Sequence, residues 1–123
     1  MRLDKLVKAT VNALDDIKGR DIVVLDVRKL TSLFDKIVIA SADSTRQAKA
    51  MSDNVQEKLK AHGAKVYGVE GEQAAEWILV DLGAVIVHIM QPAIRQHYNL
   101  EELWTPPRAT RRRSTARAEA ARD

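Results

Sequence analysis

The sequence predicts one α/β (α+β) domain: a mixed five-stranded sheet with helices packed on it. A chain of 123 residues has the length of a single domain. Apolar residues recur with helical and with strand spacing, and the segments follow one another in the order α-β-β-α-β-β-β-α. Residues 105–123 offer almost nothing to bury. The folded domain is therefore expected to span residues 1–104, followed by an Arg-rich tail.

The first helix and the first strand are predicted from apolar patterns near the N-terminus. Gly19 is expected to end the helix in the C′ position. The run from 22 to 27 is β-branched and almost unbroken, which predicts a strand buried on both faces. A second strand is expected from about Lys36 to Ala40. The apolar stripe that predicts the helix consists of Leu3, Leu6, Val7, Val11, Leu14 and Ile17.

A second helix begins at a capping sequence. Ser44 and Gln47 have the S-x-x-Q spacing of a capping box, in which each side chain bonds the backbone of the other residue. Gly63 is expected to end this helix. Its inward stripe is Ala48, Met51, Val55 and Leu59.

Three extended segments and a short helix complete the predicted domain. The segments run from 65 to 70, from 77 to 82 and from 84 to 90. Gly83 lies where the last two must reverse direction, which predicts a tight hairpin. Pro92 suits the first turn of a helix that reaches about Tyr98.

Composition excludes several classes of protein. The chain has no cysteine, so it has no disulfide, no thiolate metal site and no cysteine nucleophile. The N-terminus lacks the continuous apolar core of a signal peptide. The longest apolar runs, 77–80 and 84–87, are too short to span a membrane. We expect a soluble, cytoplasmic protein without membrane contact.

The net charge of +3 arises from the tail. Residues 1–104 hold 14 basic and 15 acidic residues, a balance of −1, whereas residues 105–123 hold six Arg against two acidic residues. The tail is expected to be disordered because it has little apolar surface to bury. Its Arg residues either contact RNA phosphate weakly or only keep the chain soluble.

Three aspartates near predicted strands raise an enzymatic alternative. Asp26, Asp35 and Asp81 could bind Mg²⁺ and support nucleotidyl or phosphoryl transfer. The chain lacks the Asp-x-Asp pair, the Gly-Ser turn and the glycine-rich phosphate loops of such enzymes. The sequence therefore predicts no catalytic, cofactor-binding or metal-binding residue. The histidines also lack metal-ligand spacing; they are His62, His88 and His97.

The residue pattern favours a binding surface instead. Glu70, Glu72 and Glu76 surround Gly71 in a predicted turn just before Trp77. A tryptophan at the start of a strand is either a core residue or an interface anchor, and acidic groups around an anchor suit a basic partner. The apolar ending from 98 to 104 either seals the core or joins the surface. The predicted interface residues are Glu70, Glu72, Trp77, Asp81, Leu82 and Tyr98.

The chain resembles the ribosomal silencing factor family (RsfS, also called Iojap or YbeB) over about residues 3–104. Each match alone is weak, but their combination is specific. The matching positions are Gly19, 21–26, 68–72, Trp77, 81–83, 87–88, Arg95, Tyr98, 100–101 and 103–104.

This resemblance implies a nucleotidyltransferase-like core without its active site, and no enzyme. It implies binding to the large ribosomal subunit through the ribosomal protein numbered fourteen of that subunit, and a weak RNA contact of the Arg-rich tail would then be with ribosomal RNA. The bound factor would block joining of the small subunit and repress translation under nutrient limitation. The alternative is a factor for biogenesis of the large subunit. Whether two copies of the chain pair as a homodimer stays open.

Overall fold

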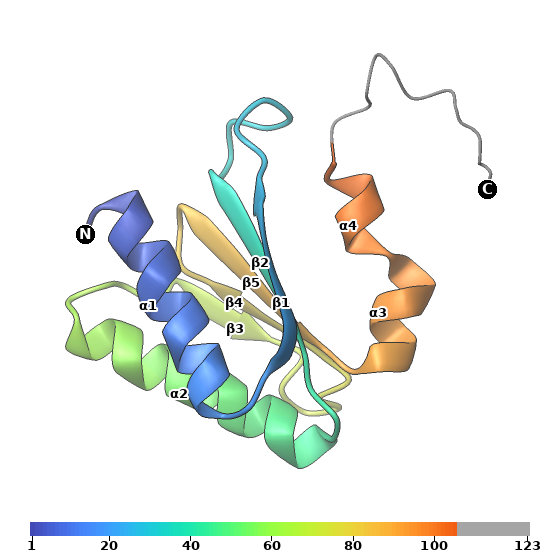
Figure 1. The fold of residues 1–123 in the computed structure, drawn as a ribbon. Helices are drawn as coiled ribbons and strands as arrows, with labels where there is room; N and C mark the ends of the chain where they lie inside the picture. Colours follow the sequence, from blue (N-terminus) through green and yellow to red (C-terminus); the bar gives the residue numbers. More distant parts are fainter. Residues whose placement is uncertain (106–123) are drawn as a thin grey trace, which may run out of the picture.

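Five strands form one mixed sheet in the order β1-β2-β5-β4-β3 (Figure 1). The computed structural model describes residues 1–105. Strands β2 and β5 pair in parallel, and all other neighbouring strands are antiparallel. The elements are α1 (Leu3–Asp16), β1 (Arg20–Asp26), β2 (Lys36–Ser41), α2 (Thr45–Ala61), β3 (Gly68–Glu70), β4 (Trp77–Asp81), β5 (Val85–Met90), α3 (Pro92–Tyr98) and α4 (Leu100–Leu103).

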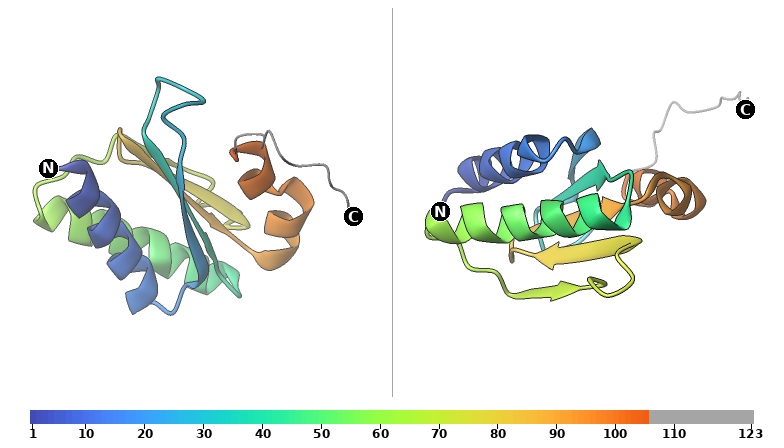
Figure 2. Two further views of the ribbon diagram at one scale, coloured as in Figure 1. Left: turned by 45° about the horizontal axis from the view of Figure 1, so that its top comes forward. Right: turned by 90° about the horizontal axis from the view of Figure 1, so that it is seen from below.

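The helices lie on both faces of the sheet. Helices α1 and α2 cover one face, which we call the helix face, while α3 and α4 lie on the other side, which we call the second face (Figure 2). The predicted element order is confirmed, and the structure adds the short helix α4 after Asn99. The predicted tail lies outside the described residues. In residues 1–105, no helix is long and apolar enough to cross a membrane.

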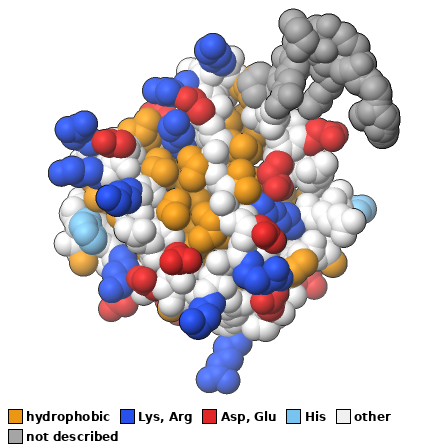
Figure 3. All heavy atoms as spheres, in the orientation of Figure 1, with side chains coloured by type: hydrophobic (Ala, Val, Ile, Leu, Met, Phe, Trp, Pro, Cys, Tyr) orange, Lys and Arg blue, Asp and Glu red, His pale blue; other side chains and the backbone are white. Residues whose placement is uncertain are grey.

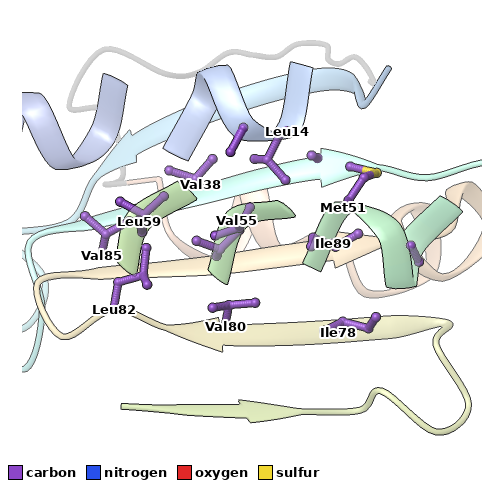
Figure 4. Packing of buried hydrophobic residues seen from close by; sticks show 14 of the residues in the cluster. Leu14, Val38, Met51, Val55, Leu59, Ile78, Val80, Leu82, Val85 and Ile89 are labelled. Carbon is purple, nitrogen blue, oxygen red and sulfur yellow. The ribbon is translucent and has the colours of Figure 1, made fainter. Parts of the chain in front are cut away.

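The main core lies between the helix face and the two long helices. Leu14 of α1 and Met51 and Leu59 of α2 meet side chains such as Val38 and Val80 from the sheet (Figure 4). All five are fully buried. Each such side chain stabilises the fold by about 1.5–3 kcal/mol. This core holds the sheet against the two long helices, and a second, smaller cluster lies on the other face.

The prediction that the first strand is buried on both faces is wrong. Strand β1 pairs only with β2 and forms one edge of the sheet, so Val24 is 40% exposed. The strand buried throughout is β2, between β1 and β5, where only Lys36 is partly exposed. A β-branched run shows that a segment is extended, but its neighbours in the sheet decide how much of it is covered.

Gly19 has a different role from the predicted one. The left-handed residue after α1 is Lys18, with a φ of 63°, and the Gly19 N–H then bonds the carbonyl of Leu14 at 3.0 Å. A Cβ at position 19 would lie 2.7 Å from the Met51 side chain. The same Cβ would lie 2.9 Å from the Leu14 carbonyl oxygen, and this backbone atom, unlike the flexible end of Met51, cannot move aside. Glycine therefore suits the tight turn that ends α1.

Other predicted helix and hairpin signals are confirmed. The Ser44 side chain accepts the N–H of Gln47 at 3.0 Å, although the Gln47 side chain bonds the N–H of Asp43 rather than that of Ser44. Gly83 adopts a φ of +85° in the β4–β5 hairpin. Pro92 occupies the first turn of α3. Strand β3 is shorter than predicted.

Candidate functional site

Strand β4 divides its side chains between the two faces. Ile78, Val80 and Leu82 pack in the helix-face core, so the alternation of a strand places Trp77 and Asp81 on the second face. Leu82 is only 4% exposed. The prediction that Leu82 fills the centre of an interface is therefore wrong for this conformation, because the residue next to Asp81 in sequence points to the opposite side of the sheet.

Two other apolar residues take that place on the second face. Leu79 lies between Trp77 and Asp81 on the same face of β4, and Ile86 of β5 lies opposite Asp81. Both side chains are partly exposed. The sequence analysis missed them, although counting every second residue from Trp77 would have found Leu79. Glu70 stands opposite Leu79 on β3, and its side chain borders the same face.

Trp77 is neither a pure core residue nor a free anchor. Its indole is half-buried and packs against the smaller apolar cluster of the second face. The indole N–H donates a hydrogen bond to Nδ1 of His88 at 3.0 Å. The ring of Tyr98 from α3 lies 5.0 Å away, centroid to centroid, and Tyr98 is 54% exposed. The two aromatic rings therefore form one partly exposed pair with fixed geometry.

His88 serves as a neutral acceptor under this pair. The imidazole is 7% exposed, and burial lowers the pKa of His88 to about 4. Because Nδ1 accepts the hydrogen bond from Trp77, the ring hydrogen of neutral His88 is on Nε2. The side chain therefore orients the indole without adding a charge at neutral pH.

The acidic turn lies against the backbone of Trp77. Gly71 has a φ of +85°, and a Cβ at this position would lie 2.1 Å from the Trp77 carbonyl oxygen. Only glycine fits, and its neighbours Glu70 and Glu72 are exposed beside the tryptophan. On the far side, Asp81 accepts the Gly83 N–H at 2.8 Å and shapes the hairpin. Glu70, Trp77, Asp81 and Tyr98 thus lie on or beside the second face.

The C-terminal helices are held on the second face by a buried arginine. Arg95 of α3 donates to the hydroxyl of Ser41 on β2 at 2.8 Å and to Glu101 of α4 at 3.0 Å. Its side chain is 9% exposed. Phe34 and Trp104 pack edge to face at 5.5 Å and close the same region. These contacts position Tyr98.

Two of the three aspartates of the enzymatic alternative already have partners within the fold. Asp26 pairs with Arg28 at 2.5 Å and with Lys36 at 3.3 Å, and the hydrogen bonds from Arg28 hold the pKa of Asp26 well below its usual range. Asp81 bonds the hairpin backbone. Across the part of the chain that the structure describes, no three His, Cys, Asp or Glu side chains are arranged to hold a metal ion.

Comparisons with known proteins agree on one family. The family model "Ribosomal silencing factor during starvation" matches residues 1–123. The ribosomal silencing factor RsfS of Chromobacterium violaceum is 49% identical over 104 residues, which are 85% of each chain. A crystal structure of a protein from the same organism has a TM-score of 0.83 and 46% identity, and covers 90% of this chain and 95% of that one.

A eukaryotic relative extends the comparison. The mouse protein "Mitochondrial assembly of ribosomal large subunit protein 1" is 36% identical over 98 residues, which are 77% of this chain and 43% of that protein. The family model and the bacterial relatives cover all or nearly all of the chain, and the structural match has the same fold. The chain therefore belongs to the ribosomal silencing factor family.

Proposed function

We propose that this domain binds the large ribosomal subunit through the ribosomal protein numbered fourteen of that subunit. In this position it blocks joining of the small subunit and represses translation when nutrients are scarce. The observation that carries the proposal is the partly exposed Trp77–Tyr98 pair on the second face, bordered by carboxylates. Membership of the silencing factor family supports the ribosome as the partner.

The surface that would contact the partner has an apolar centre and an acidic border. We call it the aromatic surface and define its centre as Trp77, Leu79, Ile86 and Tyr98. Its border consists of Glu70, Glu72 and Asp81. Tryptophan and tyrosine dominate the binding energy of many interfaces. Carboxylates around them favour a basic protein and steer its approach.

Binding alone is sufficient for this function. A domain of about 100 residues has a radius of gyration of about 13 Å, so it cannot be accommodated within a closed contact between subunits. A standard interface buries roughly 800 Å² on each partner. The factor needs that contact and enough affinity, and it needs no catalytic group.

A role in assembly of the large subunit is the second candidate. The printed name of the mouse relative supports it, because that protein is named for assembly of the mitochondrial large subunit. Both functions would use the same aromatic surface. They differ in the particle bound, since an assembly factor should prefer incomplete large subunits over mature ones.

The experiment is sedimentation of the full chain with separated ribosomal subunits, incomplete large subunits and isolated protein fourteen. Tyr98→Ala is the informative variant because Tyr98 is exposed, whereas Trp77 also packs in the second face. Loss of an interface anchor should weaken binding about 30-fold or more. Leu33→Ala is the control, since Leu33 is 82% exposed and lies in the loop between β1 and β2, outside the aromatic surface.

The particle that the chain binds distinguishes silencing from assembly. Binding to mature large subunits and to protein fourteen, with a block on joining, supports silencing. A strong preference for incomplete subunits supports assembly. If the chain sediments with no ribosomal particle, or if Tyr98→Ala binds as well as the native chain, the proposed interface is wrong.

A further inference from the structure

An open groove runs between α1 and α2, on the side of the molecule away from the aromatic surface. Its volume is about 530 Å³. The helices are antiparallel, because Gln47 near the start of α2 bonds the carbonyl of Ile17 just after α1. The end of α2 therefore lies beside the start of α1. Ala9 and Ala13 are small apolar residues among the groove's lining, so the groove stays open between the longer side chains.

One end of the groove is basic. Lys5 and Lys8 reach it from α1, and Lys58 and His62 reach it from α2. All four side chains are exposed. Figure 3 shows Lys and Arg side chains gathered at the left of the view, over the N-terminal end of α1. The ring of His62 is held there by a bond between Nδ1 and the Lys58 carbonyl at 2.8 Å.

The acidic residues of the groove do not neutralise these lysines. Asp15 and Asp16 line the groove from the last turn of α1, whereas Lys5 and Lys8 belong to its first half. Within residues 1–105, neither Lys5, Lys8 nor Lys58 forms an ion pair. Elsewhere on the domain, by contrast, Arg20 pairs with Asp43 and Arg28 pairs with Asp26.

We propose that this groove, which we call the lysine groove, binds the sugar–phosphate backbone of single-stranded RNA. A basic groove that follows a flexible backbone is the usual arrangement for such binding. Exposed lysines are suited to phosphate because each contributes a point charge and releases counterions on binding. Among residues 1–105, no Phe, Tyr or Trp lines the groove, and the one aromatic ring there, that of His62, is bonded to the Lys58 carbonyl. Phosphate contacts therefore dominate, and we expect binding to depend little on base sequence.

This site differs from the proposed protein interface in position and in charge. The lysine groove lies between the two helices of the helix face, whereas the aromatic surface lies on the second face with an acidic border. One domain can therefore contact a basic protein with one side and RNA with the other. RNA binding by the groove would stand even if the proposed protein partner were wrong.

The test measures binding of the full chain to a labelled oligouridylate of about 12 nucleotides by fluorescence anisotropy. The variant carries Lys5→Ala, Lys8→Ala and Lys58→Ala. With three phosphate contacts removed, the slope of log affinity against log salt should become shallower by about 2. At about 50 mM salt, the variant should bind at least about tenfold more weakly than the native chain.

Two controls isolate the groove. A triple variant with Lys29→Ala, Arg46→Ala and Lys49→Ala changes the net charge equally at exposed positions outside the groove and should keep nearly native affinity. Replacing Arg111, Arg112 and Arg113 by Ala tests the Arg-rich tail in the full chain. Thermal unfolding of each variant verifies that the domain remains folded.

Three results would overturn the proposal. The groove variant could keep the native affinity and salt slope, the outside triple variant could lose as much affinity as the groove variant, or polyglutamate could compete as well as RNA of equal charge. The last result would assign the groove to an acidic protein. Tyr98→Ala should leave RNA binding unchanged, so this test and the ribosome test fail independently.

Discussion

Position 71 of the chain tolerates only glycine, for two reasons that act together. Its φ is +85°, and a Cβ would lie 2.1 Å from the Trp77 carbonyl oxygen. The turn that carries Glu70 and Glu72 can therefore lie against β4 only while this side chain is absent. A single missing methyl group thus determines where the acidic border of the aromatic surface lies.

We expect Gly71→Ala to lower the free energy of unfolding by about 2 kcal/mol or more, because it adds backbone strain and a clash. Gly68→Ala is the matched control: no atom lies within 4 Å of the added Cβ, and its backbone is not left-handed. Urea unfolding measures both variants. Equal effects at 68 and 71 would show that the close approach to Trp77 does not constrain the turn.

His88 should give the domain a specific pH dependence. Burial lowers the pKa of His88 from 6.5 to about 4. In the unfolded chain this histidine therefore binds a proton below about pH 6.5, whereas in the folded domain it binds one only below about pH 4. Its contribution to stability is therefore complete above pH 6.5 and is lost as the pH falls. Between about pH 7 and about pH 5, the free energy of unfolding should fall by about 2 kcal/mol through this group.

The comparison for His88 is His88→Gln, which keeps an acceptor for the Trp77 indole but does not titrate. Urea unfolding at the two pH values should show a smaller drop in stability for this variant than for the native chain. The carboxylates of Asp26 and Asp43 have lowered pKa values, so their contribution is lost only at lower pH, outside this window. An unchanged drop in His88→Gln would contradict the assignment.

At the scale of elements, helices α3 and α4 depend on one buried side chain. Arg95 joins β2 through Ser41 and joins α4 through Glu101, and the same helix α3 carries Tyr98. Both helices are short, with seven and four residues, so they have little stability of their own. Their position on the second face therefore depends on this network and on the apolar contacts around it.

We expect Arg95→Met to lower the free energy of unfolding by about 2 kcal/mol, since Glu101 stays partly exposed and can recover some hydration. Hydrogen exchange should increase across α3 and α4, and ribosome binding should weaken because Tyr98 loses its fixed position. Arg28→Met is the control, because its pair with Asp26 is exposed to solvent and should contribute little to stability. Unchanged exchange in α3 would exclude this role for Arg95.

At the scale of the whole molecule, the domain is nearly neutral, but acidic side chains border one side and basic side chains line a groove on the other. The described part carries a small net charge, yet the aromatic surface is bordered by Glu70 and Glu72 while the lysine groove presents Lys5 and Lys58. Net charge alone would suggest no preferred partner. The distribution suggests a basic protein on one side and a polyanion on the other, and it orients the domain as it approaches them.

The sequence alone determined the fold class, the order of the elements and most of their ends. Local signals were sufficient because they act within a few residues: the apolar stripes of α1 and α2, Ser44 at a helix start, and Gly83 in a hairpin. Four of the predicted interface residues, Glu70, Trp77, Asp81 and Tyr98, lie on or beside the second face, and their role in binding stays a prediction.

Only the tertiary structure decided which side each residue faces and what it meets there. Leu82 lies in the core, Leu79 and Ile86 lie on the aromatic surface, and β1 is an edge strand. The tertiary structure also paired Trp77 with Tyr98 and assembled the lysine groove from two helices. The physical reason is that these properties depend on contacts between segments distant in sequence, which a local pattern of residues does not contain.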